Sequence, residues 1–225
     1  MHNLDLRFRA RLLFASCLLA FASYAKAAPC VFDSLDSYVA LGAGGCSIGP
    51  AQFTDFTLLP VSFTGIDPAA VLIMPGMAPG FLVTLGATAA TGETLQSTFS
   101  FLASGAAFNS ATVALIGSVV DFDGANTGVA TFTPGPTIIA FDIGVDAQLS
   151  DMAALGGVPS VLTELDFVID GGTFGSASLN QGSIAFGTSA VPEPATALLM
   201  LPALLLLAVR MKRRQISLLV RNSNH

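Results

Sequence analysis

Residues 161–170 read VLTELDFVID, and this stretch decides the fold that we expect. Apolar and acidic side chains alternate along it, with Leu165, Phe167 and Ile169 in one set and Glu164, Asp166 and Asp170 in the other. Successive side chains of a β-strand point to opposite faces of the sheet, so the alternation predicts a strand with one buried and one solvated face. Gly171 and Gly172 follow directly and predict a two-residue hairpin turn.

The rest of the segment up to residue 187 has the same character. It contains short β-prone runs, separated by turn-forming residues, at residues 52–59, 71–74, 81–85, 94–102, 111–120, 128–133, 137–142 and 183–186. Many short strands at this spacing are typical of a protein built from antiparallel sheets. We therefore expect residues 28–190 to form an all-β domain, an antiparallel β-sandwich, with no helix of useful length.

The charged residues are distributed unevenly along the chain. All nine Lys and Arg residues lie at or before Lys26 or at or after Arg210. Thirteen of the fifteen acidic residues, all except Asp5 and Glu193, lie between residues 28 and 190. Neutralising phosphates requires Lys or Arg, so this pattern excludes nucleic acid as a partner. Cationic surfaces and divalent metal ions remain as counter-charges.

Residues 1–27 have the three parts of a secretory signal peptide. The positive part holds Arg7, Arg9 and Arg11, the apolar part is LLFASCLLAF at residues 12–21, and Ala25-Lys26-Ala27 supplies small residues beside a cleavage site. We expect cleavage after Ala27 and passage through the secretion machinery. Ten apolar residues are few for a bilayer span, so an uncleaved anchor is the weaker alternative.

The C-terminal part combines three features in a fixed order. Pro192, Glu193 and Pro194 come first, an apolar stretch at residues 195–209 follows, and Arg210, Lys212, Arg213 and Arg214 come last. A helix of this length extends about 22 Å against a bilayer core of about 30 Å, and snorkelling side chains cover part of the difference. The basic cluster favours the cytoplasmic side, so residues 215–225 are expected to form a cytoplasmic tail.

This order of motif, helix and basic stop resembles the PEP-CTERM sorting segment of Gram-negative bacteria that make extracellular polysaccharide. The resemblance covers residues 191–214, and residues 215–225 extend beyond the usual end of family members. It implies recognition and cleavage by exosortase, a membrane-embedded transpeptidase-like enzyme, at a single-pass intermediate in the inner membrane. Release or transfer to the cell surface would follow. A GPI-type tail is the competing interpretation, but it lacks a basic cluster after its apolar stretch.

The cysteines agree with export. Cys17 lies within the expected signal peptide, which leaves Cys30 and Cys46 in the exported chain. In an oxidising compartment such a pair favours one disulfide, with two free thiols as the alternative. A second resemblance, to the start of many PEP-CTERM ectodomains, is carried by Cys30, Leu35, Tyr38, the run GGCSIG at residues 44–49 and the run FTDF at residues 53–56. It implies a β-rich region and no known activity.

The segment expected outside lacks the side chains of the common catalytic sites. Nucleophilic catalysis with a Ser–His or Cys–His pair needs a histidine, and both histidines, His2 and His225, lie outside residues 28–190. A glycosidase needs only two carboxylates, but among thirteen acidic residues such a pair can always be found. The chain also has no Trp for sugar stacking. We therefore expect no enzymatic activity.

One short run carries a sharper expectation. Residues 121–126 read DFDGAN and place the oxygen ligands Asp121, Asp123 and Asn126 around a glycine, as a calcium-binding loop does. Further acidic residues for such a shell are Asp142, Asp146, Glu164 and Asp166. The alternative is a hairpin in which Asp and Asn cap a turn, because Phe132 stands where an EF-hand loop has its final Glu.

Together these features predict an exported protein of the cell surface or of an extracellular exopolysaccharide matrix, with a structural or interaction role. One alternative is a calcium- or carbohydrate-binding module delivered in the same way, with residues 121–126 as its candidate site. The other is a type I membrane protein that keeps residues 195–209 as a permanent anchor.

Overall fold

The computed structural model of the chain describes residues 27–60 and 64–189. The signal peptide expected at residues 1–27, apart from its last residue, lies outside the described residues. The same holds for the Pro-Glu-Pro motif, the apolar helix, the basic cluster and the tail expected between residues 191 and 225. The chain separates into two units, Met1–Ser189 and Ala190–His225, and all described residues belong to the first. Among the described residues, no helix has the length and apolar character needed to cross a membrane.

The described part of the chain is almost entirely β-structure. In chain order its elements are β1 (Asp33–Ser34), α2 (Leu35–Ala40), the 3-10 helix η1 (Gly42–Gly44), β2 (Cys46–Ile48), β3 (Ala51–Leu58), β4 (Thr64–Gly65), β5 (Leu72–Pro75), β6 (Gly80–Ala89), β7 (Thr94–Asp121), β8 (Ala125–Thr133), β9 (Thr137–Asp142), β10 (Ala147–Gln148), β11 (Ser150–Asp170) and β12 (Ser176–Ser189). The long strands pair antiparallel with one another. The expected antiparallel β-sandwich is confirmed.

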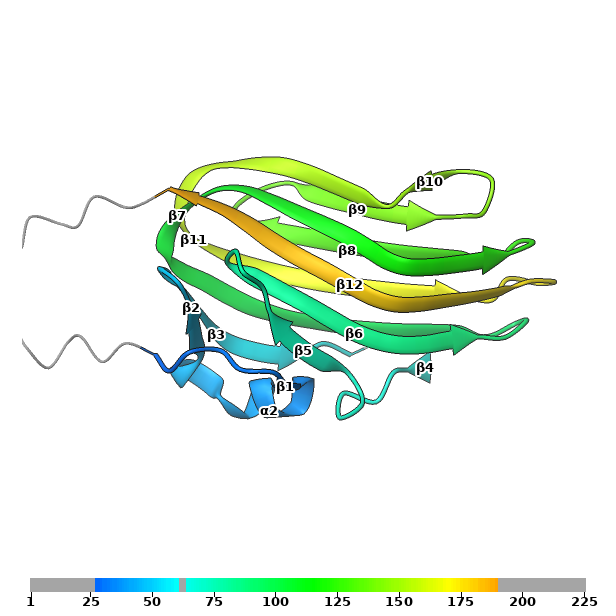
Figure 1. Ribbon diagram of the computed structural model, residues 1–225, viewed down its shortest axis with the longest axis horizontal. Coiled ribbons are helices and arrows are strands. Elements are labelled where there is room, and N and C mark those ends of the chain that lie inside the picture. The colour runs from blue at the N-terminus through cyan, green and yellow to red at the C-terminus, as the bar shows by residue number, and fades with distance from the viewer. Residues whose placement is uncertain (1–26, 61–63, 190–225) are drawn as a thin grey trace, which may run out of the picture. The chain divides into compact units, whose positions relative to one another are not determined.

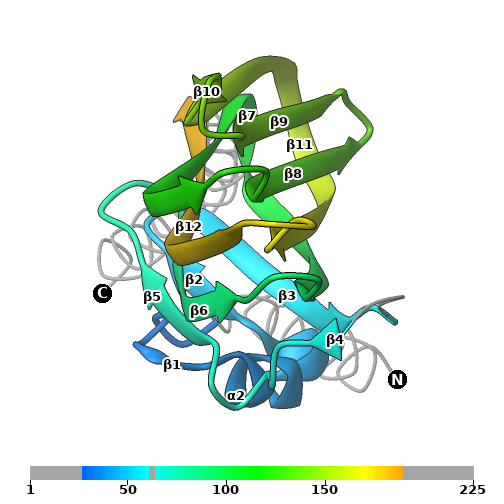
Figure 2. The ribbon, with the colours of Figure 1, turned by 90° about the vertical axis from the view of Figure 1, so that its right-hand side faces the viewer.

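The strands form two facing layers that share two long strands, β7 and β11 (Figures 1 and 2). One layer runs through β1, β5, β6, β12 and the second half of β7. The other contains β3, the first half of β7, the second half of β11, β8 and β9. A side chain on the inner face of either layer therefore packs against the other layer.

The bend of β7 lies at Gly105. The neighbour of β7 changes there from β3, which pairs up to Ser104, to β12, which pairs from Ala107 onwards. Gly105 has φ +83°, a left-handed conformation that glycine reaches without the clash of a Cβ atom. Residues 94–102 and 111–120, expected as two strands, consequently belong to one strand that continues through the bend.

Phenylalanine side chains fill the space between the layers. Phe101 of β7 lies among them, with ring centroids 5.4 Å from Phe56, 5.6 Å from Phe81 and 5.8 Å from Phe53. The Phe101 side chain is fully buried. Such offset and edge-on ring pairs contribute about 0.5–1.5 kcal/mol each beyond the burial of their area. The aromatic cluster therefore joins β3, β6 and β7 across the core.

Phe167 of β11 explains why glycine occupies a core position of β12. Its side chain is fully buried, as are those of Leu165 and Ile169, which confirms the buried face expected from their alternation. A Cβ atom added at Gly182 would lie 2.1 Å from the Phe167 ring, far inside van der Waals contact. The ring of one layer thus packs directly on the backbone of the other.

The short helix α2 closes the space between β3 and β5 at one side of the sandwich (Figure 1). The Ser34 hydroxyl caps it by accepting the N–H of Ser37 at 3.3 Å. Leu35 and Tyr38 of this helix are buried against the core. A helix of six residues is too short to show a helical period, so the sequence pattern did not predict it.

A disulfide joins Cys30 to Cys46. It links the segment before β1 to the start of β2, and Ser47 of β2 donates its N–H to the Ala28 carbonyl at 2.8 Å. The pairing favoured by the sequence is therefore confirmed. The bond fastens the N-terminal segment to the strand pair β2 and β3, which lies beside the first half of β7.

Candidate functional site

Four connections between strands gather at the end of the sandwich opposite both described termini (Figure 1). They are residues 90–93, 122–124, 143–146 and 171–175, and we call them the loop end. Figure 2 looks directly onto them. Loops held by a rigid sheet carry binding function more often than the sheet itself. The loop end also contains residues of the calcium run expected from the sequence, so it is the first candidate site.

Hydrogen bonds fasten the loop end together. The Gly92 N–H donates to the Gly172 carbonyl at 2.7 Å, and the Thr91 hydroxyl donates to the Gly175 carbonyl at 2.7 Å. The connection at residues 171–175 has five residues, so the two-residue hairpin expected at this position is wrong. Its partners lie about eighty positions away in the chain, and these long-range bonds hold a loop that local turn rules do not describe.

Asp123 joins the β7–β8 connection to the β11–β12 connection. Its carboxylate accepts the N–H of Thr173 at 2.8 Å and the N–H of Phe174 at 2.9 Å. These bonds, that of Phe174 first, hold the pKa of Asp123 below its usual value because they stabilise the ionised form. The carboxylate thus caps a neighbouring loop, a role close to the turn-capping alternative considered for this run.

Replacing Asp123 with alanine is expected to lower the thermal midpoint at pH 7, because two backbone donors lose their acceptor. The folded-state pKa is the depressed one, so the stabilisation is present above the unfolded-state pKa of about 3.9 and is lost as the pH falls through the folded-state pKa. Thermal unfolding between pH 7 and pH 2.5 should therefore show a difference from the wild type that disappears in acid. Asp121→Ala is the control, since the Asp121 carboxylate accepts no hydrogen bond from the described residues. An equal, pH-independent loss in both variants would contradict the role given to Asp123.

Two aromatic side chains stand exposed at the loop end. Phe122 is 78% exposed and Phe174 is 80% exposed, and each flanks the contacts made by Asp123. Phe122 has φ +51°, a conformation that costs a bulky residue about 1–3 kcal/mol. The fold therefore holds an aromatic ring in water in a strained conformation, whereas Phe53, Phe99, Phe101, Phe108, Phe132 and Phe167 are fully buried in the core. This arrangement suits a surface that binds a partner.

The three residues expected as calcium ligands face two different environments. Asp121 and Asp123 are exposed, whereas Asn126 is fully buried on the inner face of β8. Strand geometry explains the difference, because Asn126 already belongs to β8 and points inward. Among the described residues, no group of three or more His, Cys, Asp or Glu side chains is arranged to hold a metal ion.

A buried polar cluster lies just beneath the loop end. The Asn126 amide nitrogen donates to the Ser118 hydroxyl at 2.8 Å and to the Ser178 carbonyl at 2.8 Å. The Ser118 hydroxyl in turn donates to the Asp142 carboxylate at 2.7 Å. Asp142 was expected among the acidic residues near the site, but Ser118 was not. Ser118 follows Gly117, whose φ of +65° interrupts the alternation of inward and outward side chains along β7. The sequence pattern therefore did not place this serine inward.

Glu164 and Asp166 do not join this region. Both lie on the outer face of β11, four or more residues from its end, which corresponds to roughly 13 Å or more along the strand. Asp166 accepts hydrogen bonds from the Gln96 side chain at 2.8 Å and from the Thr98 hydroxyl at 2.7 Å. Its carboxylate is therefore part of a polar surface shared by β7 and β11.

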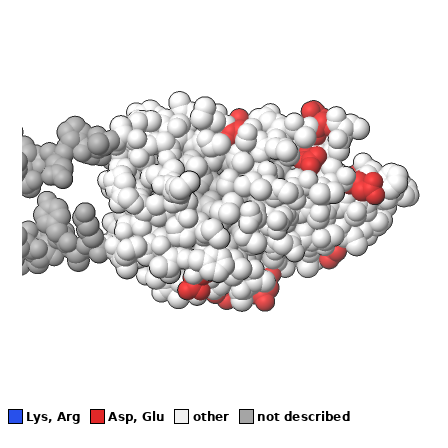
Figure 3. Space-filling view, in the orientation of Figure 1, with Lys and Arg blue, Asp and Glu red and all other residues white. Residues whose placement is uncertain are grey.

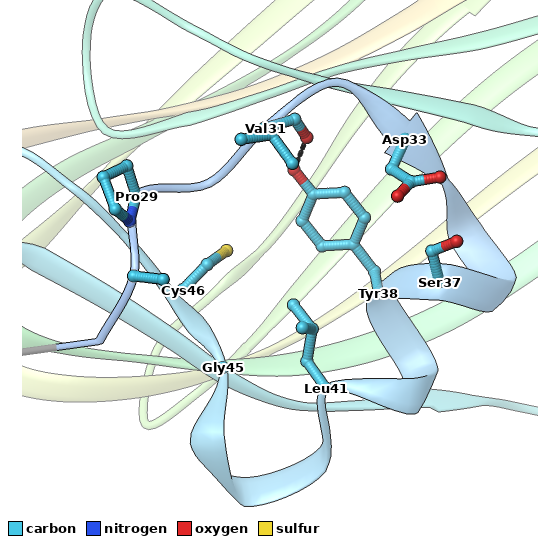
Figure 4. A pocket seen from close by; sticks show the side chains of 9 residues that line it. Pro29, Val31, Asp33, Ser37, Tyr38, Leu41, Gly45 and Cys46 are labelled. Atoms are coloured by element: carbon cyan, nitrogen blue, oxygen red, sulfur yellow. Dashed lines mark hydrogen bonds between the residues drawn. The ribbon is translucent and has the colours of Figure 1, made fainter.

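A concave region lies beside the disulfide (Figure 4). It is found near β2, at the end of the domain away from the loop end (Figure 1). Its volume is about 240 Å³, and it is lined by Ala28, Pro29, Val31, Asp33, Ser37, Tyr38, Leu41, Gly45 and Cys46. Burial, with a smaller contribution from the charge of Asp33, raises the pKa of Tyr38 to about 12. The phenol therefore stays protonated near neutral pH and donates to the Val31 carbonyl. This recess is apolar and small.

Acidic side chains are the only charged groups over the described part of the chain, residues 27–60 and 64–189. Figure 3 shows them in separate places on one face, several of them towards the loop end, without any Lys or Arg among them. Charges of one sign repel one another and attract cations. The electrostatic field of this surface therefore favours neutral or cationic partners.

Comparisons with known proteins give no family. No protein-family model matches the chain, and no curated protein matches it. Among solved structures it is similar to TmCBM61 in complex with beta-1,4-galactotriose, with 5% identity over 68% of this chain and 94% of the other and a TM-score of 0.28. It is also similar to the Podospora anserina GH26-CBM35 beta-(1,4)-mannanase (14% identity, 64% and 28% of the two chains, TM-score 0.21). A third is a Bacillus thuringiensis Cry1Da tryptic core variant (13% identity, 61% and 24%, TM-score 0.21). At these TM-scores none of the three decides the ligand of this chain.

Proposed function

We propose that this chain is an exported, non-enzymatic protein of the bacterial cell surface or extracellular matrix, sorted by exosortase, whose domain acts by binding through its loop end. The observation that carries the proposal is the confinement of all nine basic residues to the two ends, around an acidic body. That pattern suits a chain whose ends are held at the cytoplasmic side while the body is translocated.

Two features of the domain support export. The Cys30–Cys46 disulfide suits an oxidising compartment. The chain leaves the domain after Ser189 at the end opposite the loop end (Figure 1). Within the described residues, the proposed binding surface is thus remote from the strand end that leads into the expected sorting segment.

Intact mass of the protein recovered from cells tests the sorting step. In a host with an exosortase we expect a product that lacks both residues 1–27 and the apolar stretch at residues 195–209. In the same host without the enzyme, residues 195–209 should be retained. A variant with Pro192, Glu193 and Pro194 all replaced by alanine should also retain them, because the recognition motif is lost. Retention of the stretch in every host would contradict sorting and favour the permanent type I anchor.

A second candidate function, carbohydrate binding, is favoured by Phe122 and Phe174. Both rings are exposed on loops that hydrogen bonds hold in place, as an aromatic surface for pyranose rings requires. Each ring contact contributes about 1 kcal/mol, so the double alanine variant loses about 2 kcal/mol and should bind extracted matrix polysaccharide roughly thirtyfold more weakly. Met77→Ala is the control, because Met77 is a fully exposed apolar side chain that lies between β5 and β6, away from the loop end. Unchanged binding of the double variant would exclude the loop end as the sugar site.

A further inference from the structure

The polar cluster beneath the loop end consists of side chains that the fold brings together from three strands. Asn126 of β8 and Asp142 of β9 are directly opposite one another in the antiparallel pair. Residues in that position have Cβ atoms about 4.5–5.5 Å apart on the same face of the sheet. Asn126 is fully buried and Asp142 is only 9% exposed, so both side chains point into the sandwich. Ser118 reaches the same place from β7.

Oxygen atoms surround the Asn126 amide. Its nitrogen lies 2.8 Å from the Ser118 hydroxyl oxygen, 2.8 Å from the Ser178 carbonyl oxygen and 3.4 Å from the Val119 carbonyl oxygen. The Asp142 carboxylate is one hydrogen bond further away, 2.7 Å from the Ser118 oxygen. These hydrogen bonds of the nitrogen fix the orientation of the amide, and the amide oxygen takes no part in them.

Among the described residues, one group of this cluster lacks a hydrogen-bond partner and another lacks a counter-charge. The Asn126 amide oxygen is buried and has no hydrogen-bond partner there, which is a costly state for an acceptor. The Asp142 carboxylate accepts from Ser118 and from the Gly144 N–H, but no Lys, Arg or His occurs in residues 27–189 to balance its charge. A water molecule would satisfy the amide oxygen alone, whereas a cation would satisfy both groups.

We propose that a small oxygen-seeking cation, with calcium as the divalent candidate, binds in this cluster between β7, β8, β9 and β12. The Asn126 amide keeps its orientation and offers its unpartnered oxygen to the cation, and the Asp142 carboxylate, opposite Asn126 in the strand pair, supplies the negative charge. Water entering past the connection at residues 143–146 completes the six to eight oxygens that calcium takes. With a single carboxylate, the Kd is on the order of 10⁻⁴–10⁻³ M, the range of extracellular calcium modules.

This site differs from the calcium loop expected from the sequence: it includes Asn126, and Asp142 from the further acidic residues, but neither Asp121 nor Asp123. Asp121 and Asp123 are exposed on the connection above, and Asp123 is engaged by two backbone N–H groups. The proposal also stands apart from the sorting step and from the ligand of the loop end. Its experiment can therefore fail or succeed without deciding either of them.

The experiment makes two measurements on the purified mature protein: calcium binding by titration calorimetry, and the thermal midpoint of unfolding. Calcium, sodium and a chelator are compared at constant ionic strength, with tetramethylammonium as the cation too large for the cluster. We expect calcium to raise the midpoint, and Asp142→Asn to weaken calcium binding at least tenfold while retaining a folded protein, since the amide has nearly the shape of the carboxylate and its oxygen still accepts the Gly144 N–H. Asp121→Asn and Asp123→Asn should leave calcium affinity unchanged.

The outcomes separate the possible sources of an effect. If sodium raises the thermal midpoint above its value in tetramethylammonium, and Asp142→Asn abolishes that increase, the same cluster binds a monovalent cation. No response of the wild type to calcium or sodium would mean that water alone fills the cluster and would overturn the proposal. A calcium response lost in Asp121→Asn or Asp123→Asn but kept in Asp142→Asn would overturn it as well, because the ion would then lie in the exposed loop.

Discussion

Replacing Phe101 with alanine is expected to lower the free energy of unfolding by about 3–5 kcal/mol, the usual cost of removing a fully buried aromatic side chain. The Phe101 side chain has no exposed surface, and its ring contacts rings from β3, β6 and β12. The variant would leave a cavity where both layers meet, and the neighbouring rings, themselves packed against one another, have little freedom to fill it. Because domains of this size are stable by about 5–15 kcal/mol in total, a large part of the folding free energy would be lost.

Urea denaturation followed by far-ultraviolet circular dichroism measures this effect. Phe174→Ala is the matched control, since it removes the same side chain from a position that is 80% exposed. It should change the free energy of unfolding by less than about 0.5 kcal/mol. A loss below about 1 kcal/mol for Phe101→Ala would mean that the aromatic cluster is not the centre of the core.

Removing the disulfide should give the second largest effect. A variant with Cys30 and Cys46 both replaced by alanine is expected to be less stable by about 3 kcal/mol, because the bond closes a loop with a sequence separation of 16. The loss falls mainly on the unfolded state, whose chain gains freedom when the loop opens. The segment before β1 and the strand pair β2 and β3 should loosen first, since the bond fastens them together.

Denaturation of the oxidised wild type, the reduced wild type and the double alanine variant measures the contribution of the bond. The reduced protein and the variant should unfold at similar, lower urea concentrations. The oxidised form should also be about 2 Da lighter than the reduced form, by loss of two hydrogens. Coinciding unfolding curves for all three proteins would show that the bond adds no stability.

The sequence pattern was informative where one property repeats along a strand. The alternation at residues 161–170 placed Leu165, Phe167 and Ile169 correctly in the core, because a sheet with one buried face imposes a period of two residues. The same rule did not show that the runs at 94–102 and 111–120 form one strand. A left-handed glycine reads as a turn in sequence, whereas in this fold Gly105 lets β7 pass from one layer into the other.

The candidate site was less accessible to sequence reasoning because it depends on contacts between distant segments. The run at residues 121–126 drew attention to the correct region, but spacing alone placed Asn126 beside Asp121 and Asp123. The chain changes from loop to strand at residue 125, and the Asn126 side chain therefore points into the core, towards Ser118 and Asp142. The five-residue connection after β11 was missed for a similar reason, since Asp123 and Thr91 hold it from elsewhere in the chain.

The continuity of β7 and β11 through both layers has a consequence for how the domain comes apart. Neither layer can detach while the other remains, because each of these strands would have to keep one half ordered and release the other. Opening should therefore be all-or-none across the sandwich. The backbone amides of β7 and β11 should be among the slowest in the protein to exchange with solvent, since only complete opening exposes them.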